Sequence, residues 1–202
     1  GCIRDFYKGI IMPSKVDICN EALNLLGANT IASLTETSAA AVLCNRIYDT
    51  EVDYLLRQHS WNSAIREANL AAVTGTPIVG WLYKFLMPTD PYCLRVINVY
   101  DTTDEEENWE CRGRHIYADV SSIDIVYVGR ITDPNEFDSM FMKTLVDLLA
   151  YRMAFPITRD RQTTSAMFEL FRNSMADAMS VDSQERTPEQ IQSEDLLDAR
   201  LR

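Results

Sequence analysis

The side chains that could act as a general base or a metal ligand are few and widely spaced in this sequence. Only two histidines are present, His59 and His115, and neither has a second histidine or a cysteine at metal-ligand spacing. His59 continues the apolar stripe of an expected helix, which favours a partly buried structural histidine over a catalytic one. His115 lies beside Arg112 and Arg114, a small basic cluster that could contact an acidic partner or a phosphate.

Cysteines and glycines also form no catalytic or cofactor-binding pattern. The five cysteines are an odd set without a CxxC pair or a preceding signal peptide, so we expect a reduced, cytoplasmic environment. Cys93 and Cys111 fall in neighbouring expected strands and could approach each other, although small apolar strand positions explain them equally well. The glycines of segment 75–80 lack the Gly-Lys-Ser/Thr ending of a phosphate loop. We therefore expect no catalytic, cofactor-binding or metal-binding residues, and a protein that acts through its surfaces.

Negative charge dominates the composition and gathers in one short run. The formal net charge of −11 argues against a large electrostatic contact with DNA, because phosphate binding requires clustered Lys and Arg. The same charge suits a surface past which nucleic acid must slide without sticking. The run 101–107 contains five acids and no base, so it is expected either to project into water or to face a basic partner. Its acids are Asp101, Asp104, Glu105, Glu106 and Glu107.

Two helices are expected in the first third of the chain. Ser14 and Asp17 are typical of a helix start, and apolar residues then recur on one face until Gly27 ends the run. A longer amphipathic helix is expected from residue 39 to residue 61. Its central stripe consists of Cys44, Tyr48, Val52 and Leu55. Each helix therefore has one apolar face to bury.

The middle of the chain has the pattern of short strands. Helical spacing is lost from residue 65, and the glycines and the proline of 75–80 break the chain. Strands are expected at about 82–87, 93–100, 109–117 and 123–128. The connection 88–91 is short, which predicts that the first two of these strands pair antiparallel.

A second helical region follows the strands. Asp133, Pro134 and Glu136 are typical of a capped helix start. This helix is expected to end near Pro156, and a second helix from Thr158 should pack against it as an antiparallel pair. The apolar faces consist of Phe137, Met140, Phe141, Leu145, Leu148 and Leu149 in the first helix and of Met167, Phe171, Met175 and Ala178 in the second. The methionine-rich positions are expected in the core or on faces that contact a neighbouring copy.

These elements predict an α+β fold, an antiparallel helical bundle with an inserted small antiparallel β-sheet. Residues 13–62 and 132–180 are expected to form the bundle and residues 63–131 the sheet. Met12 has the appearance of an alternative start, so residues 1–12 are interpreted as an N-terminal extension. Residues 181–202 are interpreted as a docking tail, in which a polar linker at 182–188 precedes apolar residues with nothing local to pack on. The candidate docking residues are Ile191, Leu196, Leu197 and Leu201.

Several motifs occur in an order that is more specific than any one of them. They are Val16-Asp17-Ile18-Cys19-Asn20-Glu21-Ala22-Leu23-Asn24-Leu25-Leu26-Gly27, Tyr48-Asp49 with His59-Ser60-Trp61-Asn62, Leu86-Met87-Pro88-Thr89-Asp90, and Tyr127-Val128-Gly129-Arg130-Ile131-Thr132-Asp133-Pro134 with Ala154-Phe155-Pro156-Ile157-Thr158. In this order and spacing, over roughly Lys15 to Met179, the chain resembles the tail tubular protein A family. These proteins are the head-to-tail adaptors of short-tailed bacteriophages and related prophages. The first twelve residues depart from the resemblance.

The resemblance implies packed helices bearing a small β-sheet and an architectural role without catalytic residues or cofactors. It also implies a ring, usually of twelve copies, seated below the portal protein and above the tail nozzle protein. DNA would pass through the central channel without sequence-specific binding, and an acidic lumen would repel its backbone. The expected location is the connector of the virion tail, and the host cytoplasm during assembly, with no membrane involved. The candidate docking residues of the tail then become candidate portal contacts.

Two other functions remain open at this point. One is a virion-associated peptidoglycan hydrolase that uses acids of the strand region with His115 nearby, because thirty acids always offer some pair at the separation that glycoside cleavage requires. The other is a cytoplasmic regulator that sequesters a basic partner through residues 101–110.

Overall fold

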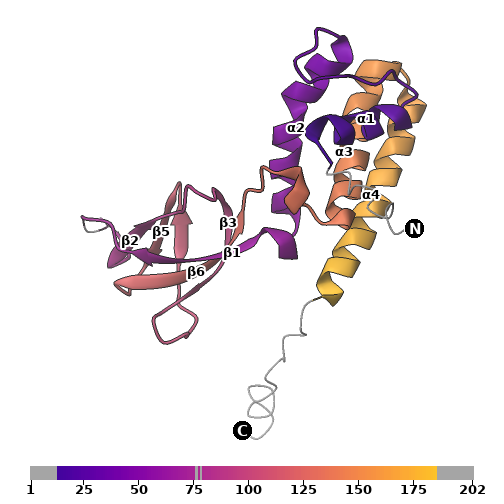
Figure 1. The fold of residues 1–202 in the computed structure, drawn as a ribbon. Coiled ribbons are helices and arrows are strands. Elements are labelled where there is room, and N and C mark those ends of the chain that lie inside the picture. The colour runs from indigo at the N-terminus through magenta and orange to yellow at the C-terminus, as the bar shows by residue number, and fades with distance from the viewer. Residues whose placement is uncertain (1–12, 76, 78, 186–202) are drawn as a thin grey trace, which may run out of the picture.

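The computed structural model describes residues 13–75, 77 and 79–185, and the described residues form a helical unit and a β unit (Figure 1). The helical unit contains α1 (Lys15–Leu25), α2 (Ala39–Gln58), α3 (Ser139–Thr158) and α4 (Arg161–Gln184). The strands lie between α2 and α3 in the chain. The predicted α+β fold, in which strands are inserted into a helical bundle, is therefore confirmed. Among the described helices, none has both the length and the apolar character needed to cross a bilayer.

Local capping explains where the helices begin. The Ser14 hydroxyl accepts a hydrogen bond from the Asp17 amide, and the Asp17 carboxylate accepts one from the Ser14 amide at 2.9 Å. This reciprocal capping box, expected from the sequence, stabilises the first turn of α1. Side chains also cap the other three helices: Ser38 caps α2, Asp138 caps α3 and Asp160 caps α4.

The helix start expected at Asp133 is a separate short element. Asp133 caps a 3-10 helix, η2 (Pro134–Glu136), and α3 begins only after Asp138. Phe137 separates the two elements, because its backbone is extended while its side chain is buried against the core. The Glu136 carboxylate contacts Arg66 at 3.1 Å and does not close a capping box. The sequence predicts one continuous helix capped by Asp133. This prediction was wrong, because the chain is not helical between Glu136 and Ser139.

The second helix ends earlier than expected because Trp61 turns back into the core. α2 stops at Gln58, and the backbone of His59 is extended. Trp61 is 1% exposed, and its indole Nε1 donates to the Leu55 carbonyl at 2.9 Å. Its ring also lies edge to face with Phe141, with centroids 5.2 Å apart. This buried anchor fixes the exit from the helical unit, and a short 3-10 helix, η1 (Asn62–Ala64), leads into the strands.

Six strands form two antiparallel sheets of three strands each in the described residues. The first sheet has the order β1-β6-β3, formed by β1 (Ile65–Ala71), β6 (Ser122–Gly129) and β3 (Cys93–Tyr100). The second has the order β2-β5-β4, formed by β2 (Tyr83–Leu86), β5 (His115–Ala118) and β4 (Glu110–Arg112). The prediction of alternating buried residues in β6 is confirmed, because Ile123, Ile125 and Tyr127 are all buried.

The strand pairing differs from the sequence prediction. β2 and β3 were expected to pair across the turn 88–91, but β2 pairs with β5 and β3 pairs with β6. The guanidinium of Arg114 explains the difference, since it donates to the carbonyls of Pro88 and Cys93 at 2.7 and 2.6 Å and fastens the turn to the β4–β5 hairpin. The single strand expected over 109–117 is this hairpin, and Cys93 and Cys111 lie in different sheets.

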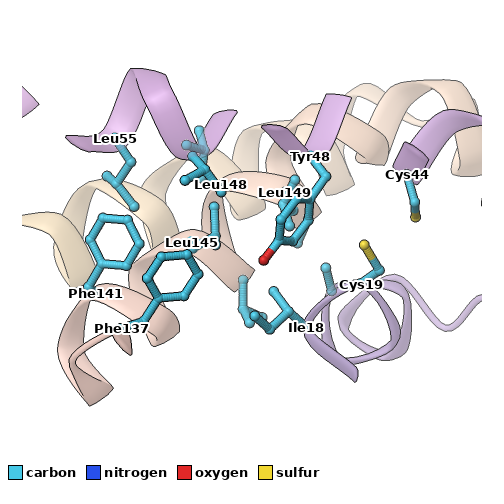
Figure 2. Close-up of a cluster of buried hydrophobic side chains, with 14 of the residues drawn as sticks. Ile18, Cys19, Cys44, Tyr48, Leu55, Phe137, Phe141, Leu145, Leu148 and Leu149 are labelled. Carbon is cyan, nitrogen blue, oxygen red and sulfur yellow. The ribbon is translucent and has the colours of Figure 1, made fainter. Parts of the chain in front are cut away.

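The helices pack around one apolar core and the strands around a second. Figure 2 shows side chains of α1, α2 and α3 meeting in the helical core. Its largest fully buried members are Ile18, Leu23, Leu55, Leu56, Trp61, Phe141, Leu145 and Leu148. The stripe predicted for α2 is confirmed, since all four of its residues are buried. Phe85, Ile116, Ile123 and Ile125 centre the core of the β unit.

α3 and α4 form the antiparallel pair that the sequence predicts. The Thr144 hydroxyl lies 3.4 Å from the Ser174 carbonyl, and the Tyr151 ring packs on Phe168 with centroids 5.2 Å apart. A later residue of α3 therefore contacts an earlier residue of α4, which shows that the two helices run in opposite directions. The turn is tight, because Arg159 takes the left-handed conformation and Asp160 caps the next helix. α3 includes Pro156 in its last turn and ends at Thr158, two residues beyond the expected end.

Candidate interaction surfaces

The acidic run 101–107 is an ordered loop at the end of the β unit that lies far from the helices. β3 begins beside the helical unit, where Arg95 donates to the Ser60 hydroxyl at 2.6 Å, and it ends at Tyr100. The loop closes on itself through Asp101, whose carboxylate accepts hydrogen bonds from the Thr103 and Glu105 amides at 2.7 and 3.0 Å. A hydrogen bond from the Thr103 hydroxyl, together with these two amide bonds, lowers the pKa of Asp101. Asp101 therefore shapes the loop.

The remaining acids of the loop face solvent. Asp104, Glu105 and Glu106 are exposed, and Glu107 is partly exposed. Asp104 also lines a hollow of 560 Å³ with Glu67 and Asp124 from β1 and β6. The hollow has no basic residue in its lining. The far end of the β unit thus carries a negative surface that would repel phosphate groups.

A first apolar surface on the helical unit is a groove of about 600 Å³ between α1, α3 and α4. We call it the α1/α3/α4 groove. Leu25 is 44% exposed at its rim. The residues that line it are Glu21, Asn24, Leu25, Ser139, Met142, Lys143, Val146, Asp147 and Leu170. Most of its accessible lining is apolar, which is typical of a surface that another chain segment covers.

The α1/α3/α4 groove also carries charge. Asp147 is 1% exposed, and its carboxylate contacts the ammonium of Lys143 at 3.3 Å, within the same helix. Lys143 itself is largely exposed. Glu21 adds a second carboxylate on the α1 side. A buried carboxylate with one partially solvated cation is a site at which an incoming donor gains more than at the open surface.

A second apolar surface, which we call the aromatic face, lies on the other side of the α3–α4 pair. Phe155 and Phe168 are 45% and 39% exposed, and Tyr151 stacks on Phe168. The guanidinium of Arg152 lies 5.6 Å from the ring centres of both Tyr54 and Tyr151, so the surface continues onto α2. Aromatic and arginine side chains of this kind are enriched where binding energy concentrates in protein interfaces.

Helix geometry places the two surfaces on opposite sides of α4. Phe168 and Leu170 are two residues apart, which is about 200° around a helix axis. Met179 and Val181 repeat this relation three turns later, and they are 36% and 41% exposed. One stripe therefore runs from Phe168 to Met179 and the other from Leu170 to Val181.

The C-terminal end of α4 is fixed to the end of α2. The Asp182 carboxylate pairs with His59 Nε2 at 2.8 Å and accepts from the Asn62 amide at 2.9 Å. The Asn62 side-chain amide donates to the Asp182 carbonyl at 2.8 Å. His59 is partly buried, as the sequence predicted. The expected linker at 182–188 starts too early, because these bonds hold α4 together through Gln184.

The structure places the other predicted residues as follows. His115 lies in β5 opposite Leu86 of β2, and its ring centre is 6.5 Å from that of Tyr117. Within the described ranges, no group of three or more His, Cys, Asp or Glu side chains is arranged to hold a metal ion. The candidate portal contacts Ile191, Leu196, Leu197 and Leu201 lie outside the described residues, as do residues 1–12.

The methionines divide between the core and the surface. Met153 is fully buried, while Met140, Met142, Met167 and Met175 are partly buried against the helical core. Met179 is exposed on the aromatic side of α4. Core packing thus explains most of the methionine content. The α1/α3/α4 groove could not be predicted from the sequence, because it combines three helices distant in sequence. The apolar residues Leu25, Leu170 and Val181, which interrupt otherwise polar outer positions, were its only local signal.

Comparison with known proteins adds no further identification. No model of a known protein family matches the chain, and no curated protein matches it.

Proposed function

We propose that this chain is a bacteriophage head-to-tail adaptor that forms a ring between the portal protein and the tail nozzle protein. DNA passes through the central channel of this ring during genome ejection, and the subunit is structural and not an enzyme. The subunit acts in the connector of the virion tail and is assembled in the host cytoplasm. The motif order over residues 15–179 and the α+β architecture that this resemblance implies support the proposal.

The observation that carries the proposal is the pair of apolar surfaces on opposite sides of the helical unit. A ring built from one kind of chain needs two different patches on each copy, one for each neighbour. The α1/α3/α4 groove is concave and carries Glu21 and Asp147, whereas the aromatic face presents Phe155, Phe168 and the cation of Arg152. The two surfaces thus differ in shape and in charged groups: the groove has two carboxylates beside Lys143, and Arg152 of the aromatic face pairs with Glu51 at 3.0 Å. Contact between them in successive copies would bury both.

The charge distribution supports a channel that DNA passes without binding. The formal net charge is −11, and the far end of the β unit carries the exposed acids of the loop 101–107. A wall of this sign repels the phosphate backbone and avoids a pore to which DNA adheres. A hydrolase needs a substrate-binding cleft with paired acids, whereas His115 lies in β5 between Leu86 of β2 and Arg112 of β4, with its ring beside Tyr117. The adaptor is therefore the better-supported function.

Docking to the portal is assigned to residues 186–202, with Ile191, Leu196, Leu197 and Leu201 as contacts. The test is the molar mass of the purified chain by light scattering, with and without the cognate portal. The chain alone should run near 23.0 kDa, because each lateral contact is too weak until the portal arrays the copies. Portal addition should produce rings, and deletion of residues 188–202 should abolish capture. Unchanged capture after that deletion would refute the role given to the tail.

A further inference from the structure

The α1/α3/α4 groove lies within reach of the chain end. Thr144 lies level with Ser174 in the antiparallel pair, so the groove residues of α3, from Ser139 to Asp147, lie alongside the C-terminal half of α4. The exposed side chain of Val181 continues the stripe of Leu170 toward the end of the helix. This side of α4 therefore leads from the groove past Asp177 to Gln184, where α4 ends.

The length of the chain beyond α4 matches this path. Leu170 lies fourteen residues before Gln184, or about 21 Å along the helix axis. Leu197 lies twelve residues beyond Glu185, and an extended chain of that length spans up to about 40 Å. The point of departure is fixed, because Asp182 is bonded to His59 and Asn62. Residues 196–201 can therefore reverse direction and reach the whole groove of their own subunit.

The chemistry of the two partners also matches. Residues 196–202 contain the apolar Leu196, Leu197 and Leu201, and their two bases, Arg200 and Arg202, outnumber the one acid, Asp198. The groove offers an apolar lining with two carboxylates, Glu21 and the buried Asp147. Asp177 lies seven residues after Leu170, almost two full turns on, and so faces the same side of α4. Arginine pairs well with carboxylates of this kind.

We infer that, in the free subunit, residues 196–202 occupy the α1/α3/α4 groove of the same chain. This inference rests on the proposed function and adds a form of regulation to it. While the tail is docked, a neighbouring copy cannot bind the groove, and the portal cannot bind the leucines of the tail. Portal binding withdraws the tail and exposes the groove, so lateral assembly starts only on the portal.

The fraction of free subunits with a docked tail follows from mass action. A short tether gives the tail an effective concentration of about 1 mM near its groove. If the groove binds the free segment with a Kd of about 0.1 mM, the tail is docked about 90% of the time. The apparent affinity of the tail for the portal is then reduced about tenfold. This occupancy is sufficient to suppress assembly at micromolar concentrations and is easily overcome by a ring of portal sites.

Disulfide trapping in the full chain tests the inference with a matched control. In a background with Cys2→Ser and Cys111→Ser, Leu197→Cys is combined either with Leu170→Cys in the groove or with Phe168→Cys on the opposite side of α4. The two target positions are two residues apart, about 3 Å along the helix axis, so the main difference between them is the side of the helix. Under mild oxidation without portal, the Leu170 pair should form an intramolecular disulfide about tenfold faster than the Phe168 pair.

Equal rates for the two pairs would overturn the inference, and so would a disulfide that forms only between two molecules. Hydrogen exchange gives a second measurement. Full-length chain with Leu196, Leu197 and Leu201 changed to serine should lose protection at residues 21–25, whereas unchanged protection contradicts tail docking. Loss of that protection on changing Ile10 and Ile11 to serine, with the tail intact, would assign the groove to the N-terminal segment instead. A chain that traps the Leu170 pair but never binds portal would keep this inference and overturn the proposed function.

Discussion

Replacing Phe168 with aspartate should block lateral assembly while leaving the subunit folded. A phenylalanine side chain buries about 150–250 Å², and 39% of Phe168 is exposed, so about 60–100 Å² remains for a neighbouring copy to cover. At about 25 cal/mol per Å², this burial contributes about 2 kcal/mol to each contact. Its loss alone weakens the contact about 30-fold. The aspartate adds a desolvation cost in the same direction.

The assay is titration of portal rings with the variant, followed by light scattering. The concentration of Phe168→Asp at half-saturation should be at least about 30-fold higher than that of the unchanged chain. Ser180→Asp is the matched control, because it adds the same charge to an exposed position of α4 that belongs to neither surface. If the concentration of Phe168→Asp at half-saturation is within about threefold of the value for this control, the aromatic face is not part of the lateral contact.

A mixture of two variants tests whether the contact runs head to tail. Phe168→Asp damages the aromatic face and Leu170→Asp damages the α1/α3/α4 groove. In an equimolar mixture, the intact groove of one variant meets the intact aromatic face of the other, so pairs should form on the portal although neither variant assembles alone. No recovery in the mixture would contradict a contact made by two different surfaces.

Other predictions concern stability, charge and thiol chemistry. Asp182→Ala should lower the free energy of unfolding by about 2–3 kcal/mol in urea, because it leaves the buried side of His59 and the Asn62 amide without their carboxylate partner. Changing the three glutamates of 105–107 to lysine should leave unfolding within about 0.5 kcal/mol and should create salt-sensitive DNA binding in a filter assay. Alkylation at pH 8 should modify the exposed Cys111 well before Cys93, because burial raises the pKa of the Cys93 thiol to about 11 and keeps it protonated.

Each of these predictions has an outcome that contradicts it. Asp177→Ala is the control for Asp182→Ala, since Asp177 is exposed on the same helix. Equal stability of the two variants would show that the contacts of Asp182 with His59 and Asn62 do not stabilise the fold. Absence of DNA binding by the lysine variant at low salt would show that the loop acids do not keep DNA away. Simultaneous alkylation of Cys93 and Cys111 would mean that the β core opens on the timescale of the reaction.

The elements that the sequence predicts well are those with local physical causes. Ser14 and Asp17 cap α1 through contacts three residues apart, and the alternation of Ile123, Ile125 and Tyr127 follows from one buried sheet face. β1 was missed as a strand because its side chains are half-buried or exposed and include charged residues on both faces, so its pairing with β6 leaves little apolar alternation.

The pairing of strands and the surfaces depend on contacts that no local pattern contains. Arg114 fastens the turn after β2 to a hairpin about 25 residues later in the chain, which directs β2 to β5. Trp61 ends α2 by binding the carbonyl of Leu55, although tryptophan is no helix breaker. The α1/α3/α4 groove joins Leu25 with Leu170 across the whole sequence. Such features depend on tertiary packing, and the structure is needed to find them.

The most direct test of the proposed adaptor role is the mass and symmetry of the complex that the chain forms with its cognate portal. Light scattering together with electron microscopy should show a single chain of 23.0 kDa on its own and a closed ring of copies stacked on the portal after mixing. A chain that stays monomeric beside intact portal rings, with no added density below them, would contradict the proposed role.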